Sequence, residues 1–397
     1  MPISLVIHMI KFLKVVMNTS DWYQIRNANK PITFQLLDLL RGFAAISVLF
    51  WHYQHFYYQT IPGGLTYSQQ NQPFFNELRI LYSQGGRAVQ VFWVISGFVL
   101  MHTYLSSKRK TRDFFVSRIA RLYPLHLITL IFVAVLQLIS MKIFGHFQIY
   151  SINDFKHFLL NILFIPKIGL ENGYSFNAPF WSVSVELIAY IIFGLTVKYY
   201  AHKKFLPITI LILSLFLSFF GGQNSLQSIT TAVFFFYSGV FIYQIFNHLN
   251  NRISISIGIL FITFYFIFKF LDRDIIESTS ILYRFSNHNY FVVFFYSGII
   301  LSISNLETIL KRKIIKISKF TNFIGNLTYS TYLWHIPIQI IAIGIVEKMN
   351  LDPVLVFNRK IPLILYLASV VLFSRLSFLK LEKPTRFYVK KRFEIED

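Results

Sequence analysis

Three charged or titratable side chains interrupt an apolar stretch at residues 36–54, LLDLLRGFAAISVLFWHYQ. They are Asp38, Arg41 and His52. Arg41 and His52 are eleven positions apart, so in a helix they share one face and lie about 16 Å apart along its axis. An ionised side chain inside a bilayer costs about 2.5 to 3.5 kcal/mol and normally faces a protein interior or a wet cavity. The spacing therefore favours a polar path within the membrane. Alternatively, Asp38 and Arg41 neutralise each other as an ion pair one turn apart while His52 reaches the headgroups.

Two further polar side chains are expected at membrane depth. Glu186, in APFWSVSVELIAYIIF, lies about seven residues into a helix that enters from the outer side, near the level of His52. A carboxylate there could orient the imidazole and raise its basicity; alternatively, Glu186 is an interfacial glutamate near a helix start. His335, in LTYSTYLWHIPIQ, precedes Pro337 by two residues. Because a proline kinks a helix, we expect His335 to be a structural histidine bonded across helices.

An arginine pair marks the segment SSKRKTRDFFVSRIARLYP. Arg118 and Arg121 are three positions apart, so they project from one side of a helix start at the membrane surface. Paired guanidinium groups bind phosphate bidentately, and this pair predicts a specific anion. The neighbouring basic run at residues 108–112 is expected to bind anionic lipid headgroups instead.

The composition is that of an integral membrane protein. Of 397 residues, 55% are hydrophobic and only 14% are charged, whereas soluble domains carry about 25% charged residues. The net charge of +21 comes from lysines and arginines placed between long apolar runs. That pattern fits membrane topology and not nucleic-acid binding. The absence of cysteine excludes disulfides, thiolate metal sites and cysteine catalysis, and no other metal site is expected.

Ten apolar stretches meet or approach the roughly 20 residues that a spanning helix needs, which predicts an all-α polytopic membrane helix bundle. They are residues 34–56, 88–105, 122–144, 179–199, 205–221, 229–247, 253–271, 289–305, 323–347 and 361–381. The loops on one side hold most of the lysines and arginines, which fits ten spans with both termini cytoplasmic. A shorter apolar piece at 157–165 should lie in the interface or re-enter.

The predicted organisation is one transmembrane domain with short ends. Residues 1–30 are expected to form an N-terminal extension, possibly interfacial. The transmembrane domain covers residues 31–385, and residues 386–397 form a cytoplasmic tail.

Six motifs, in order, resemble the integral-membrane acyltransferase 3 family, a largely bacterial group that O-acylates cell-surface glycans. They are LDLLRGFAAISVLFWH, AVQVFWVISGFVL, FFVSRIARLYPLH, NAPFWSVSVE, IGNLTYSTYLWHIP and LEKP. The resemblance covers residues 36–384, with Trp93 where phenylalanine is usual. Some members carry an esterase-like domain after the last span; its absence here implies an acceptor glycan that approaches the membrane itself.

The resemblance implies that acetyl-CoA, or another acyl-CoA, binds from the cytoplasm and that its acyl group reaches a sugar hydroxyl on the other side. Arg41 and His52 match the family's essential arginine and histidine, and Arg118 and Arg121 match its arginine pair. A pantetheine arm on the order of 15 to 20 Å long would span a separation like that between Arg41 and His52. Neutral His52 would act as general base with Glu186 holding its tautomer, although an acyl group carried by His52 itself fits equally.

Two other classes of function remain open. A transporter or flippase for a lipid-linked saccharide would also place charged residues in a polar cavity, but it would not need paired arginines beside a deep histidine. A non-catalytic membrane scaffold predicts that Arg41 and His52 tolerate substitution. For the enzyme, the expected partners are acyl-CoA, a glycan or lipid-linked sugar, and the lipids of the inner (plasma) membrane.

Overall fold

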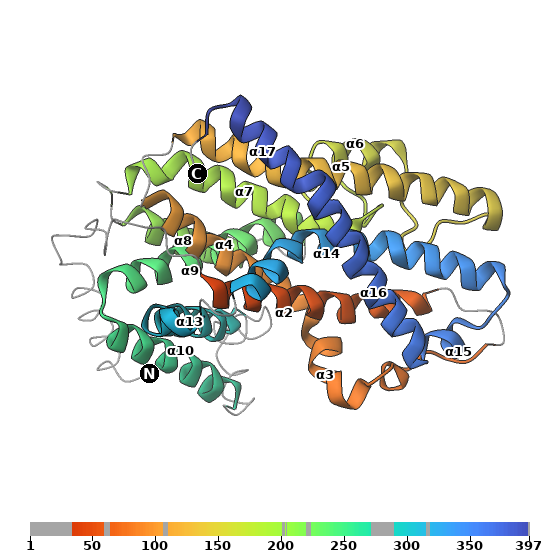
Figure 1. Cartoon of the computed structure of the whole chain (residues 1–397), viewed down its shortest axis with the longest axis horizontal. Helices are drawn as coiled ribbons and strands as arrows, with labels where there is room; N and C mark the ends of the chain where they lie inside the picture. The colour runs from red at the N-terminus through yellow and green to blue at the C-terminus, as the bar shows by residue number, and fades with distance from the viewer. Residues whose placement is uncertain are drawn as a thin grey trace.

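Every secondary-structure element is helical in the residues that the computed structural model describes, which confirms the predicted all-α class (Figure 1). Those residues are 34–58, 64–105, 110–200, 203, 205–219, 224–270, 290–314 and 318–395, so the expected interfacial extension at residues 1–30 lies outside them. The α-helices are α2 (Gln35–His52), α3 (Phe75–Gln84), α4 (Ala88–Leu105), α5 (Thr111–Phe144), α6 (Phe155–Ile162), α7 (Trp181–Thr196), α8 (Leu206–Ser218), α9 (Ser225–His248), α10 (Asn251–Lys269), α13 (Val292–Ile314), α14 (Ser318–Lys348), α15 (Pro353–Phe357), α16 (Lys360–Ser377) and α17 (Lys383–Arg392). Short turns of 3-10 helix are η1 (Tyr53–Tyr57), η2 (Gln69–Asn71), η3 (Gly85–Arg87), η4 (Ala178–Phe180) and η5 (Val197–Tyr199), and η7 (Phe378–Glu382) is a π-helix.

Eight helices in the described part of the chain are long and apolar enough to cross a membrane. They include α2, α5, α7, α9, α10, α13, α14 and the segment from α16 to α17. Of the ten predicted spans, the remaining two correspond to α4, an apolar helix of 18 residues, and α8, which has 13. At 1.5 Å per residue, α8 covers about 20 Å, less than the roughly 30 Å hydrocarbon core. The apolar piece near residue 160 forms α6, a helix of eight residues.

The first described helix, α2, packs closely along α14. A Cβ atom added to Gly42 of α2 would lie 2.0 Å from Cγ2 of Ile324, and one added to Gly325 of α14 would lie 2.7 Å from Cγ of Asp38. Small residues let helix backbones approach in membranes, where packing replaces the hydrophobic drive between helices. These two glycines therefore set the separation of the two helices that carry Arg41, His52 and His335.

The start of α2 depends on a side chain from a distant helix. The residue before it, Phe34, has no side-chain oxygen to accept from the first free N–H groups. Glu307 of α13 accepts instead, with Oε1 2.5 Å from the backbone nitrogen of Gln35 and Oε2 2.9 Å from that of Leu36. A carboxylate at a helix N-terminus also interacts favourably with the helix dipole. Glu307 therefore fixes the end of α2 nearest Arg41.

A proline within α14 creates a polar contact to the turn that precedes α7. Pro337 has no backbone N–H, so the carbonyl of Leu333 loses its usual partner within the helix. Nδ2 of Asn177, at the turn before α7, donates to that carbonyl at 2.9 Å. Inside a membrane such a freed group must find a partner in the protein. The contact ties the sequence NAPFW to the part of α14 that carries His335.

The last span continues without a break into the C-terminal helix (Figure 1). The π-helical turn η7 joins α16 to α17, and single π-turns are frequent at functional sites. Glu382 in this turn is buried, accepts a hydrogen bond from Ser330 Oγ of α14, and pairs with Arg386 at 2.9 Å. The domain boundary predicted at residue 385 therefore falls within the continuous helical segment from α16 to α17.

The largest apolar core is rich in aromatic residues and lies mainly around α4, α7 and α9. Its fully buried members include Phe98, Phe193, Phe235, Phe236 and Tyr237. Large apolar side chains elsewhere on the spans are exposed, such as Leu138 on α5 and Ile364 on α16, as expected for surfaces that face lipid.

Candidate active site

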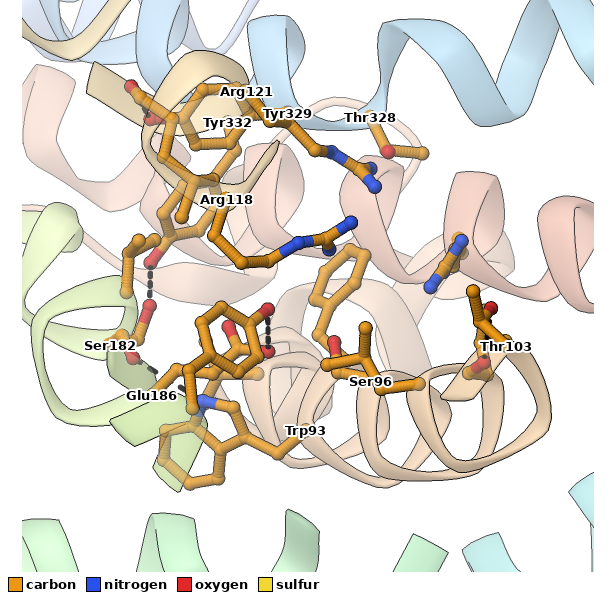
Figure 2. Close-up of a pocket in the computed structure, with 18 residues that line it drawn as sticks. Trp93, Ser96, Thr103, Arg118, Arg121, Ser182, Glu186, Thr328, Tyr329 and Tyr332 are labelled. Atoms are coloured by element: carbon orange, nitrogen blue, oxygen red, sulfur yellow. Dashed lines mark hydrogen bonds between the residues drawn. The ribbon is translucent and has the colours of Figure 1, made fainter. Parts of the chain in front are cut away.

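An elongated cavity with a volume of about 140 Å³ lies between α2, α4, α5, α7 and α14 (Figure 2). On α4 it is lined by one helix face, at Val89, Phe92, Trp93, Ser96, Val99, Leu100 and Thr103. The 14 positions from Val89 to Thr103 correspond to about 21 Å of helix rise. The volume is below the roughly 300 to 1,000 Å³ of pockets that enclose a whole drug-sized ligand, and the lining runs along α4, so the space has room for a thin part of a ligand.

Three arginines line this cavity. Arg41 comes from α2, and Arg118 and Arg121 come from adjacent turns of α5. Figure 2 shows the guanidinium groups of Arg118 and Arg121 extending across the cavity toward the side on which Thr103 lies. Arg41 pairs with Asp38, its NH1 atom 3.4 Å from Oδ1. The ion pair that was weighed as an alternative therefore exists, but its arginine lines a cavity with two more arginines.

The arginine pair on α5 has little local compensation. Among the described residues, neither Arg118 nor Arg121 makes an ion pair within 4.0 Å, and Nε of Arg118 is buried without a hydrogen-bond partner. Asp38, Glu186 and Glu382 interact with Arg121 electrostatically from farther away. Unpaired guanidinium groups in a buried polar space favour an anionic ligand.

Glu186 lies with the arginines and not with the imidazole of His52. Its side chain lines the same cavity, is 8% exposed, and accepts a hydrogen bond of 2.7 Å from the hydroxyl of Tyr190. No contact with His52 is found among the described residues. The expected His52–Glu186 dyad is therefore not formed. The depth of Glu186 along α7 indicates its level in the membrane but not its direction, and Glu186 lies on the same face of α7 as Tyr190, toward α4 and α5.

His52 is the last residue of α2 and lies in a cluster of three imidazoles. The ring centroids of His55 and His335 are each 4.9 Å from that of His52. Nδ1 of His52 is 3.1 Å from the carbonyl oxygen of Val48. A carbonyl oxygen can only accept a hydrogen bond, so Nδ1 must carry the proton of the neutral ring. Nε2 then keeps its lone pair. Within the described ranges, no group of three or more histidine, aspartate or glutamate side chains is arranged to hold a metal ion.

Gln339 of α14 connects the cluster to the end of α2. Its Nε2 donates to the carbonyl oxygen of His52 at 2.8 Å, and its Oε1 is 3.0 Å from Nδ1 of His55. His335 bonds within its own helix, from Nδ1 to the carbonyl oxygen of Tyr332 at 2.7 Å, and not across helices as expected. His55 and Gln339 were not among the residues expected at the site. His55 lies one turn after His52, which is a signal that could have found it; Gln339 has no comparable signal.

One face of α14 leads from the cavity to the imidazoles. Thr328 and Tyr332 line the cavity, and His335 and Gln339 follow at the same helical spacing, over about 16 Å of rise in total. The ring centroids of Tyr332 and His335 are 5.8 Å apart. The Tyr332 hydroxyl donates to the carbonyl of Pro179 and is 2.6 Å from Oγ of Ser182 (Figure 2). The cavity thus ends at Tyr332, and His52 lies beyond it.

A histidine–carboxylate pair at the start of α6, outside the spanning helices, has a structural role. Asp154 accepts from the backbone nitrogen of His157 at 2.8 Å and from its Nδ1 at 2.7 Å, which caps α6. These backbone and side-chain hydrogen bonds lower the pKa of Asp154. Nε2 of His157 accepts from the backbone nitrogen of Asn172 at 3.2 Å. With both ring nitrogens engaged, this histidine has no free lone pair for acid–base chemistry.

The comparisons with known proteins agree with the resemblance noted in the sequence. The acyltransferase domain family model (Acyl_transf_3) matches residues 34–378. The chain is 22% identical, over 413 aligned positions, to the O-acetyltransferase OatA of Staphylococcus aureus strains NCTC 8325 / PS 47 and COL. The alignment covers 95% of this chain and 61% of those relatives, and no solved structure matches. Because the family model covers most of the chain, the protein belongs to the acyltransferase 3 family.

Proposed function

We propose that this protein is a membrane O-acyltransferase that moves an acetyl, or similar acyl, group from cytoplasmic acyl-CoA to a hydroxyl of a cell-surface or lipid-linked glycan. Family membership and the similarity to O-acetyltransferases support the reaction class. The protein is a multi-pass membrane protein. We infer that it lies in the inner (plasma) membrane, with ten spans and both termini in the cytoplasm. The ten helices at the predicted stretches and the basic loops on one side support that topology.

The observation that carries the proposal is the narrow cavity with three arginines at one part of it. An acyl-CoA has a phosphorylated nucleotide head and a long, thin arm that ends in a thioester. Guanidinium groups bind phosphate bidentately, and about 21 Å of cavity along α4 fits an extended arm. Arg118 and Arg121 would hold the phosphates, with Arg41 beside them. Glu186 and Tyr190 would keep the opposite wall polar and fix the arginines electrostatically.

His52 is proposed as the general base. Its Nε2 lone pair would accept the proton of the acceptor hydroxyl while the hydroxyl oxygen attacks the thioester carbon. The acyl C–S bond breaks, an ester C–O bond forms, and the proton finally leaves with the thiolate as CoA–SH. A transient acyl group on His52 has the same overall balance. Because the cavity ends at Tyr332, the thioester must pass this side chain to meet His52.

Calorimetric titration of CoA into the purified protein in nanodiscs tests the donor. We expect saturable binding to the wild type, and weaker binding when Arg118 and Arg121 are both replaced by glutamine. Arg375→Gln is the matched control, because it also removes a guanidinium from a spanning helix. Arg375 lies outside the cavity, with its guanidinium carbon 4.9 Å from the centroid of the Phe323 ring. A protein that binds no CoA but moves lipid-linked saccharide across vesicles would be a flippase, and the proposal would be abandoned.

Transfer itself is tested by incubating the same nanodiscs with acetyl-CoA labelled in the acetyl group and with glycan-bearing membranes. We expect label in the glycan fraction and none with His52→Ala. Mass spectrometry of surface polysaccharide from cells with and without the gene then identifies the sugar and the position modified. Equal acetylation in both cell types would contradict the proposed acceptor class.

A further inference from the structure

The hydroxyl group of Tyr332 lies at one end of the cavity, together with Ser182, and Thr103 lies toward the other end (Figure 2). The guanidinium groups of the α5 arginine pair extend toward the Thr103 side. Trp93, whose Nε1 donates to the backbone carbonyl of Ser182 at 3.3 Å, is ten positions before Thr103 on α4, or about 15 Å of helix rise. A donor with its phosphates at the arginines and an extended arm would therefore bring its thioester to the Tyr332 end.

The Tyr332 hydroxyl is a hydrogen-bond donor that its present acceptor can release. It donates to the carbonyl oxygen of Pro179, and Oγ of Ser182 is 2.6 Å from the Tyr332 hydroxyl and 3.2 Å from the same carbonyl oxygen. Each hydroxyl has one proton, so Ser182 donates to Tyr332 while Tyr332 donates to Pro179. When Tyr332 turns to another acceptor, Ser182 can donate to Pro179 instead. The exchange leaves no buried carbonyl without a donor.

We propose that Tyr332 donates a hydrogen bond to the thioester carbonyl oxygen of the bound acyl donor, which makes it a catalytic residue. This rests on the proposed acyl transfer. Tyr332 lines the cavity, is only 6% exposed, and lies on the route that the thioester must take toward His52. A tyrosine hydroxyl is neutral, so it can wait in a buried site without a counter-ion and still face an oxygen that becomes negative during the reaction.

The hydrogen bond becomes stronger as the reaction proceeds. When the acceptor oxygen attacks the thioester carbon, the π electrons of the C=O bond move to the carbonyl oxygen, which becomes negative. A hydrogen bond to a charged oxygen is stronger than one to a neutral oxygen, so Tyr332 stabilises the transition state more than the bound donor. The C=O bond then re-forms as the C–S bond breaks. Tyr332 keeps its own proton throughout, and the sulfur receives the acceptor's proton from His52.

Two analogues of the donor isolate the carbonyl group. Acetyl-dethia-CoA keeps the carbonyl but has CH₂ in place of sulfur, so it cannot transfer its acyl group, and S-ethyl-CoA has the same length without a carbonyl. In calorimetric titrations with nanodiscs, we expect the wild type to bind acetyl-dethia-CoA about fivefold more tightly than S-ethyl-CoA, the effect of one hydrogen bond. Tyr332→Phe should bind the two analogues equally, with the wild-type Kd for S-ethyl-CoA.

Tyr82 supplies the matched control. Its hydroxyl is also buried and also donates to a proline carbonyl, that of Pro73, at 2.9 Å, but it lies on α3 outside the cavity. Tyr82→Phe should keep the wild-type preference for acetyl-dethia-CoA. The single-turnover rate of acyl transfer should fall about 100-fold in Tyr332→Phe, as for the loss of one oxyanion donor, and remain unchanged in Tyr82→Phe. A purely structural role for the Tyr332 hydroxyl predicts instead that both variants lose only stability.

Infrared difference spectroscopy of bound acetyl-dethia-CoA, labelled with ¹³C at the ketone, detects the hydrogen bond directly. A donor lowers the stretching frequency of a carbonyl, so the band should move to higher frequency in Tyr332→Phe and stay in place in Tyr82→Phe. An unmoved band, equal binding of the two analogues by the wild type, or a wild-type transfer rate in Tyr332→Phe would overturn the inference. If the wild type binds neither analogue and transfers no acyl group from acetyl-CoA, the proposed function fails instead, so the two failures are distinguishable.

Discussion

Replacement of Arg121 by glutamine tests the proposed donor site most directly. Arg121 lines the cavity together with Arg118 and Arg41 and makes no ion pair within 4.0 Å among the described residues. Its guanidinium is therefore available to a phosphate. A hydrogen bond to a charged group contributes about 1.5 to 3 kcal/mol, so Arg121→Gln should raise the Kd for CoA about 10- to 100-fold.

The assay is calorimetric titration of CoA into nanodiscs at two salt concentrations. Since a phosphate contact is screened by salt, the wild-type Kd should rise with ionic strength more steeply than that of Arg121→Gln. Arg375→Gln carries the same charge change outside the cavity and should bind CoA as the wild type does. An unchanged Kd in a folded Arg121→Gln protein, or equal losses in both variants, would refute the assignment of phosphates to this cavity.

Three further outcomes are expected. His52→Ala should abolish acyl transfer but leave the Kd for CoA unchanged, because the cavity that holds the arginines ends before His52; a parallel loss of binding would argue against two separate centres. Glu307→Ala should lower stability by about 1 to 3 kcal/mol, because the first N–H groups of α2 lose their acceptor, and a thermal melt in detergent that matches the wild type would contradict this. The pKa of Asp154 is lowered in the folded protein, so its bonds to His157 stabilise the fold above the ordinary aspartate pKa and are lost as the pH falls through the lower folded value. The free energy of unfolding of the wild type should therefore exceed that of Asp154→Asn by less and less below about pH 4. A difference that grows with acidity would contradict this.

The helical content and the shared face of the two α5 arginines could be predicted because both depend on local spacing. Arg118 and Arg121 share a face of any helix that contains them, and the eleven-residue interval from Arg41 to His52 fixes their separation on α2. The length of each apolar stretch likewise indicates a span, although α8 is shorter in the structure than its stretch of sequence suggested. Such quantities are set by the helix repeat and do not depend on the neighbours.

The partners across helices could not be predicted in the same way. Glu186 was expected at the depth of His52, but its position around the axis of α7 decides which neighbour it meets, and the packing of α4 and α5 sets that angle. His335 contacts His52 because two glycines draw α2 against α14. Gln339 and Glu307 act over separations of more than 270 residues. A single sequence carries no signal for such pairs.

The carboxylate that completes the first span is about 270 residues downstream of it. During synthesis α2 enters the bilayer long before α13 exists, so its leading turn must remain uncapped, or turn toward water, while most of the chain is made. The first of the described helices is thus among the last to be finished. The arginine cavity also takes lining residues from α14, so it cannot be complete before that helix has been made.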